Sequence, residues 1–517
     1  MNPWSGKEIT DGAPVPARSC WLLAALIILT GFLFRGAYYY GYYWVPDEEI
    51  TMRVVGHMRQ SGDWDTNWAK ADLPANLRYD QYNFSGHLYA TYFFYRFVKL
   101  LPGLEEWRSR EEGVAVYRLF SVALATFAIW QSLQIGRRAG GWVAGLAAAA
   151  LTAVASQLVQ DGHYIRPEAF TTVLTLGVVA LCWPRPSVSP RRIVGAGFLI
   201  GVLIATKISM LLLVWLPLVP LVAAECRRQA RWILLGLVPC AVVIGFGLGA
   251  PGALFHPERF LSGVSHLSVQ YAGVHPPHSH LAAGAVGDIL ARFYVSTLGW
   301  PLLACALVGA VTLVARRRWA EVALLVGPVL VFAGYFATRS VFFERNVSHV
   351  LPLVFILSAL GIVALAKFCR NKMRGSMPMW AMIVLAVLLV RPVRLSWALV
   401  EGEMSQRGML QRGQLEDGLK ARYATAKWET LEPLVPSDLA PLAAHFAARG
   451  GPVLLRVADS HDEWAADMLA RLVRQFEAQH LGDSAGLFPG VPVSTLVVYH
   501  SPESHYFLVT GLRATRP

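Results

Sequence analysis

Apolar segments alternate with short basic clusters along most of this chain, and that alternation constrains the fold more than any other feature. Of the 517 residues, 55% are hydrophobic and only 15% are charged. Soluble proteins carry about a quarter charged residues, so the sequence predicts a protein that crosses a membrane many times. The net charge of +12 comes from clusters between apolar segments, a pattern typical of membrane orientation and not of nucleic-acid binding.

Six basic clusters predict the topology. If all of them face the cytoplasm, an even number of spans must lie between neighbouring clusters. The clusters are Lys7/Arg18, Arg137/Arg138, Arg185/Arg191/Arg192, Arg227/Arg228/Arg231, Arg316/Arg317/Arg318 and Lys367/Arg370/Lys372/Arg374. About eleven transmembrane helices are then expected, at 20–38, 116–135, 142–160, 168–183, 193–206, 208–224, 232–250, 288–314, 320–337, 348–366 and 378–396. The N-terminus is expected in the cytoplasm, with the protein in the inner (plasma) membrane.

Two regions lie outside the predicted spans. The first outer segment, 45–115, is expected to hold juxtamembrane helices at 50–60 and 87–101, joined by a turn at 61–68, because these runs are amphipathic or too short to cross a bilayer. The tail from 397 carries far more charge. Its pattern predicts a small α/β domain on the periplasmic or extracellular side, with a helix at 462–479 and strands at 451–457, 494–499 and 506–510. We therefore expect a membrane domain, 1–396, and an outer domain, 397–517.

The acidic stretch Trp44-Val45-Pro46-Asp47-Glu48-Glu49 follows the first apolar segment and an aromatic run at 38–44. Tyr and Trp concentrate where a membrane meets water, so these carboxylates are expected just outside a bilayer face. Acids at that depth can activate a hydroxyl group, hold a divalent cation or begin a solvated helix, and the stretch alone leaves all three open.

Further polar residues recur on the same predicted outer face. They are His87, Asp161, His163, Arg166, Glu168, Lys207, His256, His266, Arg339, Glu344, Arg345 and His349. Cations there suit a phosphorylated lipid, because they hold the phosphate and stabilise it as a leaving group while a carboxylate takes the proton of an attacking hydroxyl. The alternative is structural: Arg166 and Lys207 can extend to the interface, and Arg345 can pair with Glu344.

The order of these features resembles that of the GT-C membrane glycosyltransferases, and most closely family 39 and its relatives, the protein O-mannosyltransferases and the lipid A aminoarabinose transferases. The likeness covers roughly 20–365. The motifs that carry it are Pro46-Asp47-Glu48, the "GDW" turn at 61–68 with the aromatic segment 88–101, Val116-Tyr117-Arg118-Leu119-Phe120 with Gly136-Arg137-Arg138, His163-Tyr164-Ile165-Arg166-Pro167-Glu168-Ala169, Ala205-Thr206-Lys207, and Glu344-Arg345-Asn346 to Leu351-Pro352-Leu353.

This resemblance implies inverting transfer of a sugar, a hexose or a pentose, from a polyprenyl-phosphate donor to a hydroxyl on the outer side of the membrane. Asp47 would be the base, supported by Glu48. The substrate-binding candidates are His87, His163, Arg166, Glu168, Lys207 and Arg345. Where relatives often carry Lys/His-Pro-Pro, this chain has Asn83-Phe84-Ser85-Gly86-His87. The phosphate-binding lysine of the aminoarabinose transferases is thus missing, and His87 or another cation would have to replace it.

Rival functions remain open at this point. A transporter or flippase of lipid-linked sugars could use the same cations, although transporters favour internal repeats and charges at the bilayer midplane, which this sequence lacks. A scaffold that presents the outer domain is a third alternative. The acceptor, which is a lipid, a glycan or a protein, is not specified by the sequence. The six cysteines are scattered singly and no Cys/His cluster predicts a metal site; a divalent cation is left open, and no other cofactor is expected.

Overall fold

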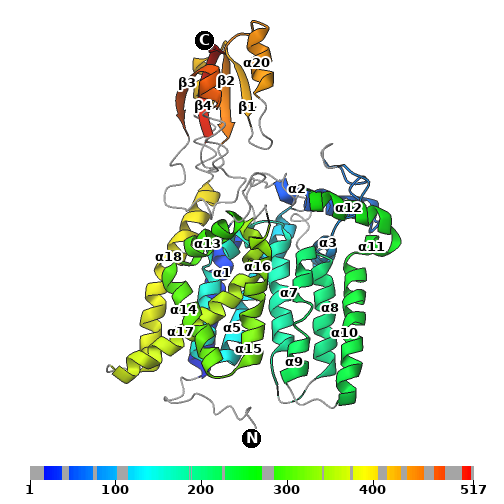
Figure 1. Ribbon diagram of the computed structural model, residues 1–517, viewed down its shortest axis with the longest axis vertical. Coiled ribbons are helices and arrows are strands. Elements are labelled where there is room, and N and C mark those ends of the chain that lie inside the picture. Colours follow the sequence, from blue (N-terminus) through cyan, green and yellow to red (C-terminus); the bar gives the residue numbers. More distant parts are fainter. Residues whose placement is uncertain are drawn as a thin grey trace. The chain divides into compact units, whose positions relative to one another are not determined.

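A computed structural model describes most of the chain (Figure 1). The described residues are 17–37, 46–73, 78–101, 114–185, 187, 189–223, 228–269, 285–339, 343–372, 376–405, 416–431, 439–458, 471–483 and 504–513. The chain divides into two compact units, which we describe separately. The first comprises 1–267, 290–336 and 343–397, and the second comprises 268–289, 337–342 and 398–517. The domain limits expected above, 1–396 and 397–517, remain a prediction.

The described part of the membrane region is almost entirely helical, as the apolar composition predicted. Its elements are α1 (Ala17–Gly36), α2 (Pro46–Ser61), α3 (Gly86–Val98), α5 (Val114–Ala153), α6 (Ser156–His163), α7 (Pro167–Cys182), α8 (Pro190–Ile204), η3 (Ile208–Leu213), α9 (Leu218–Ala223), α10 (Arg228–Gly249), α11 (Gly252–Phe255), α12 (Pro257–Val269), α13 (Ala285–Leu298), α14 (Trp300–Ala315), α15 (Trp319–Leu325), α16 (Gly327–Ala337), η5 (Glu344–Val350), α17 (Leu351–Lys372) and α18 (Met377–Ser405).

Breaks in the apolar segments change the expected number of spans. Within the described ranges, five helices are long and apolar enough to cross a membrane, or up to seven if each bent pair counts as one span. Gly141 (φ 81°) turns the chain within α5, between the spans expected at 116–135 and 142–160. Gly299 (φ 78°) separates α13 from α14, inside the single span expected at 288–314. Both need the left-handed backbone that glycine adopts readily. The segment 208–224 forms η3 and α9 instead of one long helix.

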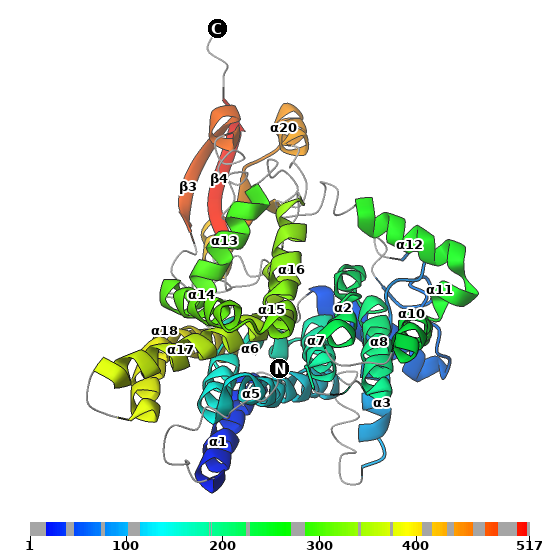
Figure 2. The same cartoon turned by 60° about the horizontal axis from the view of Figure 1, so that its bottom comes forward.

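Close helix contacts through glycine hold the bundle together. Helix α17 is largely buried and packs against α5 and α14. Gly361 on α17 faces the Cys305 carbonyl, and Gly309 on α14 faces the Leu357 carbonyl, so a side chain at either glycine would collide with backbone. Helices α8 and α10, side by side in Figures 1 and 2, meet in the same way at Gly201 and Gly245. Small residues allow membrane helices to approach closely, which supplies packing energy where lipid offers no hydrophobic drive.

The segment between α1 and α5, expected on the outer side, packs at one end of the bundle. Helices α2 and α12 lie at the upper end in Figure 1, whereas α9 and α15 lie at the lower end. Apolar side chains of α2, α3 and the start of α5 form one buried cluster, which includes Val55, Met58, Tyr92 and Tyr117. The juxtamembrane helices expected at 50–60 and 87–101 are therefore α2 and α3. The aromatic run at 38–44 lies outside the described residues.

The C-terminal unit contains a small four-stranded sheet with the strand order β1-β2-β4-β3. Its elements are β1 (Lys427–Leu431), α20 (Ala440–Ala447), β2 (Val453–Ala458), β3 (Phe476–Asp483) and β4 (Ser504–Leu512). Strands β1 and β2 run parallel, with α20 in the connection between them, and the other pairs are antiparallel. A core that includes Leu442, Val453, Phe476 and Val509 lies between the sheet and α20.

This unit confirms the predicted small α/β domain, with two strands close to where they were expected, β2 and β4. The helix expected at 462–479 is wrong at its end, because 476–479 belong to β3 and pair with β4. Most of that helix, and the strand expected at 494–499, lie outside the described residues. Strand β1 was not predicted; it is short and carries two charged residues, Lys427 and Glu429.

Candidate functional site

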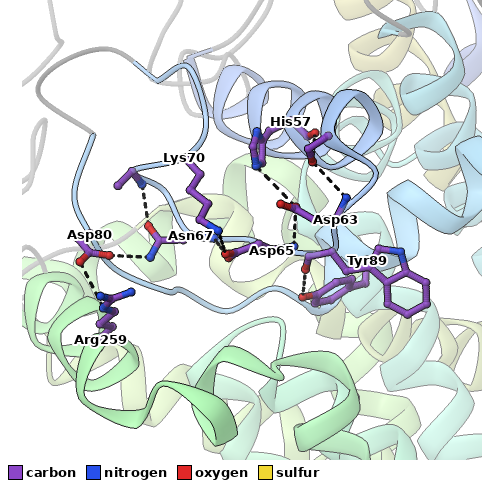
Figure 3. Close-up of polar contacts among 11 residues, drawn as sticks. His57, Asp63, Asp65, Asn67, Lys70, Asp80, Tyr89 and Arg259 are labelled. Atoms are coloured by element: carbon purple, nitrogen blue, oxygen red, sulfur yellow. Dashed lines mark hydrogen bonds and ion pairs between the residues drawn. The ribbon is translucent and has the colours of Figure 1, made fainter.

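The turn between α2 and α3 is fixed by side chains that bond to nearby backbone (Figure 3). Asp63 accepts a hydrogen bond from the N–H of Asp65 (3.1 Å), Asp65 from that of Asn67 (2.9 Å) and Asn67 from that of Ala69 (2.8 Å). Burial disfavours the charge on Asp65, but the hydrogen bonds from Lys70, the Asn67 N–H and Tyr82, with the charge of Lys70, together outweigh it and lower the pKa of that carboxyl. Short polar side chains bonded in this way rigidify a turn.

The same turn is anchored to the helices around it. The Tyr89 hydroxyl on α3 donates to the carbonyl of Trp64 (2.7 Å). The side-chain amide of Asn67 donates to Asp80 (2.7 Å), and Asp80 pairs with Arg259 of α12 (3.3 Å). The turn predicted at 61–68 is thus part of a rigid platform over one end of the bundle.

Glu48 is a buried carboxylate, and both of its oxygens are hydrogen-bonded within the protein. Its two oxygens accept hydrogen bonds from Nε (3.0 Å) and Nη2 (2.9 Å) of Arg118 on α5, and one of them also accepts from the backbone N–H of Ile165 (2.8 Å). Neither side chain of the pair is exposed. We call this arrangement, Glu48 with Arg118 and the Ile165 amide, the Glu48 clamp. It ties α2 to α5 and to the turn that precedes α7.

The end of α1 is fixed to the same region. Arg35 donates to the carbonyls of Thr152 (2.9 Å) and Ala153 (2.7 Å), which end α5 and have no partner further along that helix. The His163 imidazole lies 2.8 Å from the Phe34 carbonyl oxygen, to which Nε2 donates. His163 was predicted to bind substrate, and its Nε2 is used here to hold α1 against α6.

Asp47, the predicted base, is the second residue of α2, and its side chain lies outside the described atoms. Its backbone position is nevertheless constrained by the next residue. Glu48 accepts a hydrogen bond from the Ile165 amide, one residue before Arg166. The backbone of Asp47 therefore lies beside the turn that carries Arg166.

Arg166 lies at a sharp break between two helices. Helices α6 and α7 are bent by 119° across Tyr164, Ile165 and Arg166. The Arg166 side chain is buried, and its guanidinium carbon lies 5.0 Å from the centre of the Tyr164 ring. Among the residues that the structure describes, none of its three nitrogens has a hydrogen-bond partner. A buried guanidinium without hydrogen bonds costs several kcal/mol, so it marks a place for an anion.

Two further cations surround the carboxylate that follows Arg166. Glu168, in the first turn of α7, lies 2.9 Å from Lys207 Nζ and 3.9 Å from Arg345 Nε. Lys207 comes from the turn between α8 and η3, and Arg345 from η5. The side chain of Glu168 is 2% exposed, whereas those of Lys207 and Arg345 are 21% and 15% exposed. We call Arg166, Lys207 and Arg345 the cation cluster; it combines a buried charge with two that a ligand can reach.

The 3-10 helix η5 adds two buried polar side chains beside Glu168. Asn346 accepts a hydrogen bond from Lys207 through Oδ1 (3.3 Å), while its Nδ2 has no hydrogen-bond partner within the described ranges. His349 packs edge-on against Phe332, with 4.2 Å between ring centres, and its Nε2 is also without a described partner. Both side chains are almost completely buried.

His87 does not supply positive charge at neutral pH. It lies on α3 near the rings of Phe120 and Phe170. Burial lowers the pKa of its imidazole to about 4, and the nearby charge of Glu168 offsets this only in part. Of the two replacements considered for the missing phosphate-binding lysine, the cations Arg166, Lys207 and Arg345 therefore fit better. A role for neutral His87 in substrate binding remains a prediction.

Several of these residues were not assigned roles from the sequence. Arg118 and Asn346 stood inside motifs, but nothing in the sequence showed what they would contact. The three-residue spacing of Asn346 and His349 could have indicated that the two side chains lie on the same side of one helix, but only if the segment was known to be a 3-10 helix. Within the described part of the chain, no three His, Cys, Asp or Glu side chains are close enough together to hold a metal ion.

Comparison with known proteins gives structural neighbours only. No family model and no curated protein matches the chain. The chain is similar to ArnT from Cupriavidus metallidurans, which was solved bound to undecaprenyl phosphate and in the apo state. The sequence identity is 14% to the bound structure and 13% to the apo structure. In both cases the match covers 96% of this chain and 98% of ArnT, with a TM-score of 0.48. It is also similar to the oligosaccharyltransferase AglB from Archaeoglobus fulgidus in complex with an inhibitory peptide and a dolichol-phosphate, with 12% identity, coverage of 75% and 56%, and a TM-score of 0.43.

These neighbours are transferases of the GT-C fold, the group that the sequence motifs resemble. With such low identity and TM-scores, the similarities assign no role to any residue here. The elements themselves establish a mostly helical, multi-pass membrane protein with a small C-terminal sheet.

Proposed function

We propose that this protein is an inverting membrane glycosyltransferase that moves a sugar from a polyprenyl-phosphate donor to a hydroxyl acceptor on the extracytoplasmic side of the plasma membrane. The observation that carries the proposal is the buried Arg166 guanidinium, which has no hydrogen-bond partner among the described residues and stands with Lys207 and Arg345 at a broken helix. Phosphate oxygens satisfy a guanidinium well, because the guanidinium presents several N–H donors in one plane and the phosphate offers several negatively charged acceptor oxygens.

The break between α6 and α7 supports the same ligand. The N-terminus of a helix carries partial positive charge and unpaired N–H groups, which favours anions. Helix α7 begins at Pro167, directly after Arg166. The site is therefore suited to a lipid phosphate head group whose chain lies along the apolar helices. Both similar proteins were solved with a polyprenyl phosphate, the lipid class we propose here on the charges of this site.

The reaction needs one base and a stabilised leaving group. The acceptor hydroxyl oxygen attacks the anomeric carbon of the sugar, and the bond from that carbon to the phosphate oxygen breaks with its electron pair on the phosphate. The hydroxyl proton passes to Asp47. Arg166, Lys207 and Arg345 stabilise the charge that develops on the phosphate, and the Glu48 clamp holds α2 in place so that Asp47 reaches the acceptor.

Sugar transfer by Asp47→Asn tests the proposal. The purified protein is offered polyprenyl phosphates labelled in a hexose or a pentose, with lipid, glycan and peptide acceptors. Wild-type turnover should fall by a factor of about 100 to 10,000 in Asp47→Asn, the usual contribution of a general base, while donor binding is retained. Glu49→Gln is the matched control, because Glu49 is a partly exposed carboxylate that pairs with Arg53 on the same helix (2.8 Å).

Two outcomes contradict this assignment. Normal turnover by Asp47→Asn would remove the base from the mechanism. Donor binding by the wild type without cleavage, with every acceptor offered, would favour a transporter of lipid-linked sugars.

A further inference from the structure

Resting on the proposed function, we propose that Glu168, Asn346 and His349 form a subsite that binds the hydroxyl groups of the transferred sugar. These residues would make the enzyme distinguish a sugar-loaded lipid from the free lipid phosphate. The inference rests on hydrogen-bonding atoms of these three side chains that have no partner in the described part of the chain.

Three buried side chains around Lys207 have an atom without a hydrogen-bond partner in the described part of the chain. Those atoms are Oε2 of Glu168, Nδ2 of Asn346 and Nε2 of His349. Buried polar groups are almost always hydrogen-bonded, and one left without a partner destabilises the folded protein. Three in one place indicate that a polar ligand completes the site.

Their arrangement makes one surface. Asn346 and His349 are three residues apart on η5, and a 3-10 helix has three residues per turn, so the two side chains project from the same side. Lys207 joins Asn346 to Glu168, because its ammonium group donates to Oδ1 of one (3.3 Å) and to Oε1 of the other (2.9 Å). The His349 ring lies close enough for the charges of Lys207 and Glu168 to act on it.

The chemistry of the three atoms selects a sugar over a second phosphate. A phosphate ester contributes acceptors only, which suit Arg166 and the Asn346 amide but repel Glu168. Oε2 of Glu168 needs a donor. A sugar hydroxyl is both donor and acceptor, so neighbouring hydroxyl groups can donate to Glu168 and accept from Asn346, while His349 can serve either way. Sites that hydrogen-bond a substrate hydroxyl discriminate strongly against a ligand that lacks it.

Paired binding measurements test this inference. The full-length protein in nanodiscs is titrated with a polyprenyl monophosphate and with its hexosyl and pentosyl esters. We expect Asn346→Ala and His349→Phe each to weaken binding of at least one glycosylated lipid about 10-fold, the value of one hydrogen bond of about 1.4 kcal/mol. Binding of the sugar-free lipid should stay within about twofold. Phenylalanine at 349 keeps the ring contact with Phe332, and Asn346→Asp keeps the acceptor for Lys207 if Asn346→Ala does not fold.

Ser358→Ala is the control, since Ser358 is a buried hydroxyl on α17 whose bonds go to backbone carbonyls; it should change none of the affinities. If Asn346→Ala and His349→Phe weaken all three lipids by the same factor, or none, the sugar subsite is wrong while the phosphate site stands. If the wild type binds none of the lipids, the proposed function is wrong and the subsite falls with it.

Discussion

The Glu48 clamp and the cation cluster are two buried charged groups at the same end of the bundle, and they differ in how completely their charges are paired. In the clamp, both oxygens of Glu48 are bonded to Arg118, and one also accepts from the Ile165 amide. Among the described residues, Arg166 of the cation cluster has no hydrogen-bond partner, and Glu168 beside the cluster has one oxygen without a partner. The two groups are joined by the turn Tyr164-Ile165-Arg166.

This difference separates structure from binding. A buried ion pair whose hydrogen bonds are all formed within the protein offers a ligand few further hydrogen bonds. It does fix the helices that carry the two side chains relative to each other. A buried charge with unused hydrogen-bonding capacity raises the free energy of the folded protein until a ligand binds. In the proposed mechanism, the clamp holds Asp47 and Arg166 near each other, and the cation cluster provides the affinity for the lipid phosphate.

The largest effect should come from breaking the clamp. Glu48→Ala leaves Arg118 buried without its partner, which costs about 3–5 kcal/mol of folding free energy. Thermal unfolding in detergent should show a large fall in Tm. Arg166→Gln removes a buried charge that has no hydrogen-bond partner among the described residues and that acts on Asp161 and Glu168 only at longer range, so Tm should fall much less than in Glu48→Ala. The double variant Glu48→Gln/Arg118→Gln is the control, because it removes both charges and should recover part of the loss. Equal losses of stability in Glu48→Ala and Arg166→Gln would contradict the comparison.

The second effect concerns ligand stabilisation. A ligand that binds only the folded protein stabilises it by about 2.7 kcal/mol at 100 times its Kd. A polyprenyl monophosphate should therefore raise the Tm of the wild type. At the same lipid concentration Arg166→Gln should lose most of that increase, because the guanidinium that contacts the phosphate is gone. Arg96→Gln on α3 serves as the control, since Arg96 contacts Tyr92 away from the cluster (3.2 Å). The same increase in Tm in wild type and Arg166→Gln would place the phosphate elsewhere.

The sequence predicted the members of the cation cluster but not its geometry. Arg166, Lys207 and Arg345, with the carboxylate Glu168 that they surround, come from three segments far apart in the chain, and the alternating topology alone predicted them at one membrane face. The 2.9 Å contact between Lys207 and Glu168 could not be predicted, because it depends on how α7 and the end of α8 are rotated.

The partner of Glu48 was equally hidden. Arg118 stands 70 residues further along the chain, inside an apolar helix. Apolar periodicity shows that a helix forms there but not which carboxylate an internal arginine meets. The break at Gly299, inside the span expected at 288–314, was missed for a related reason. An isolated glycine in an apolar run looks like a packing residue, and only the folded chain shows that it turns the backbone.

The smallest expected effect is on the pH dependence of Tm, and it tests whether His87 is a neutral structural residue or a charged member of the phosphate site. The folded state lowers the pKa of His87 from 6.5 to about 4, so the unfolded chain binds its proton at a higher pH than the folded protein does. The stability from keeping this imidazole neutral is complete well above pH 6.5 and is lost progressively as the pH falls toward 4. Between about pH 7.5 and 5.5 the loss should be about 1 kcal/mol. His87→Gln, which cannot be protonated, should flatten the Tm profile over this interval relative to the wild type. A wild-type profile that His87→Gln leaves unchanged would show that His87 does not titrate there, whereas a Tm that rises toward pH 5.5 and loses that rise in His87→Gln would make His87 a charged member of the phosphate site.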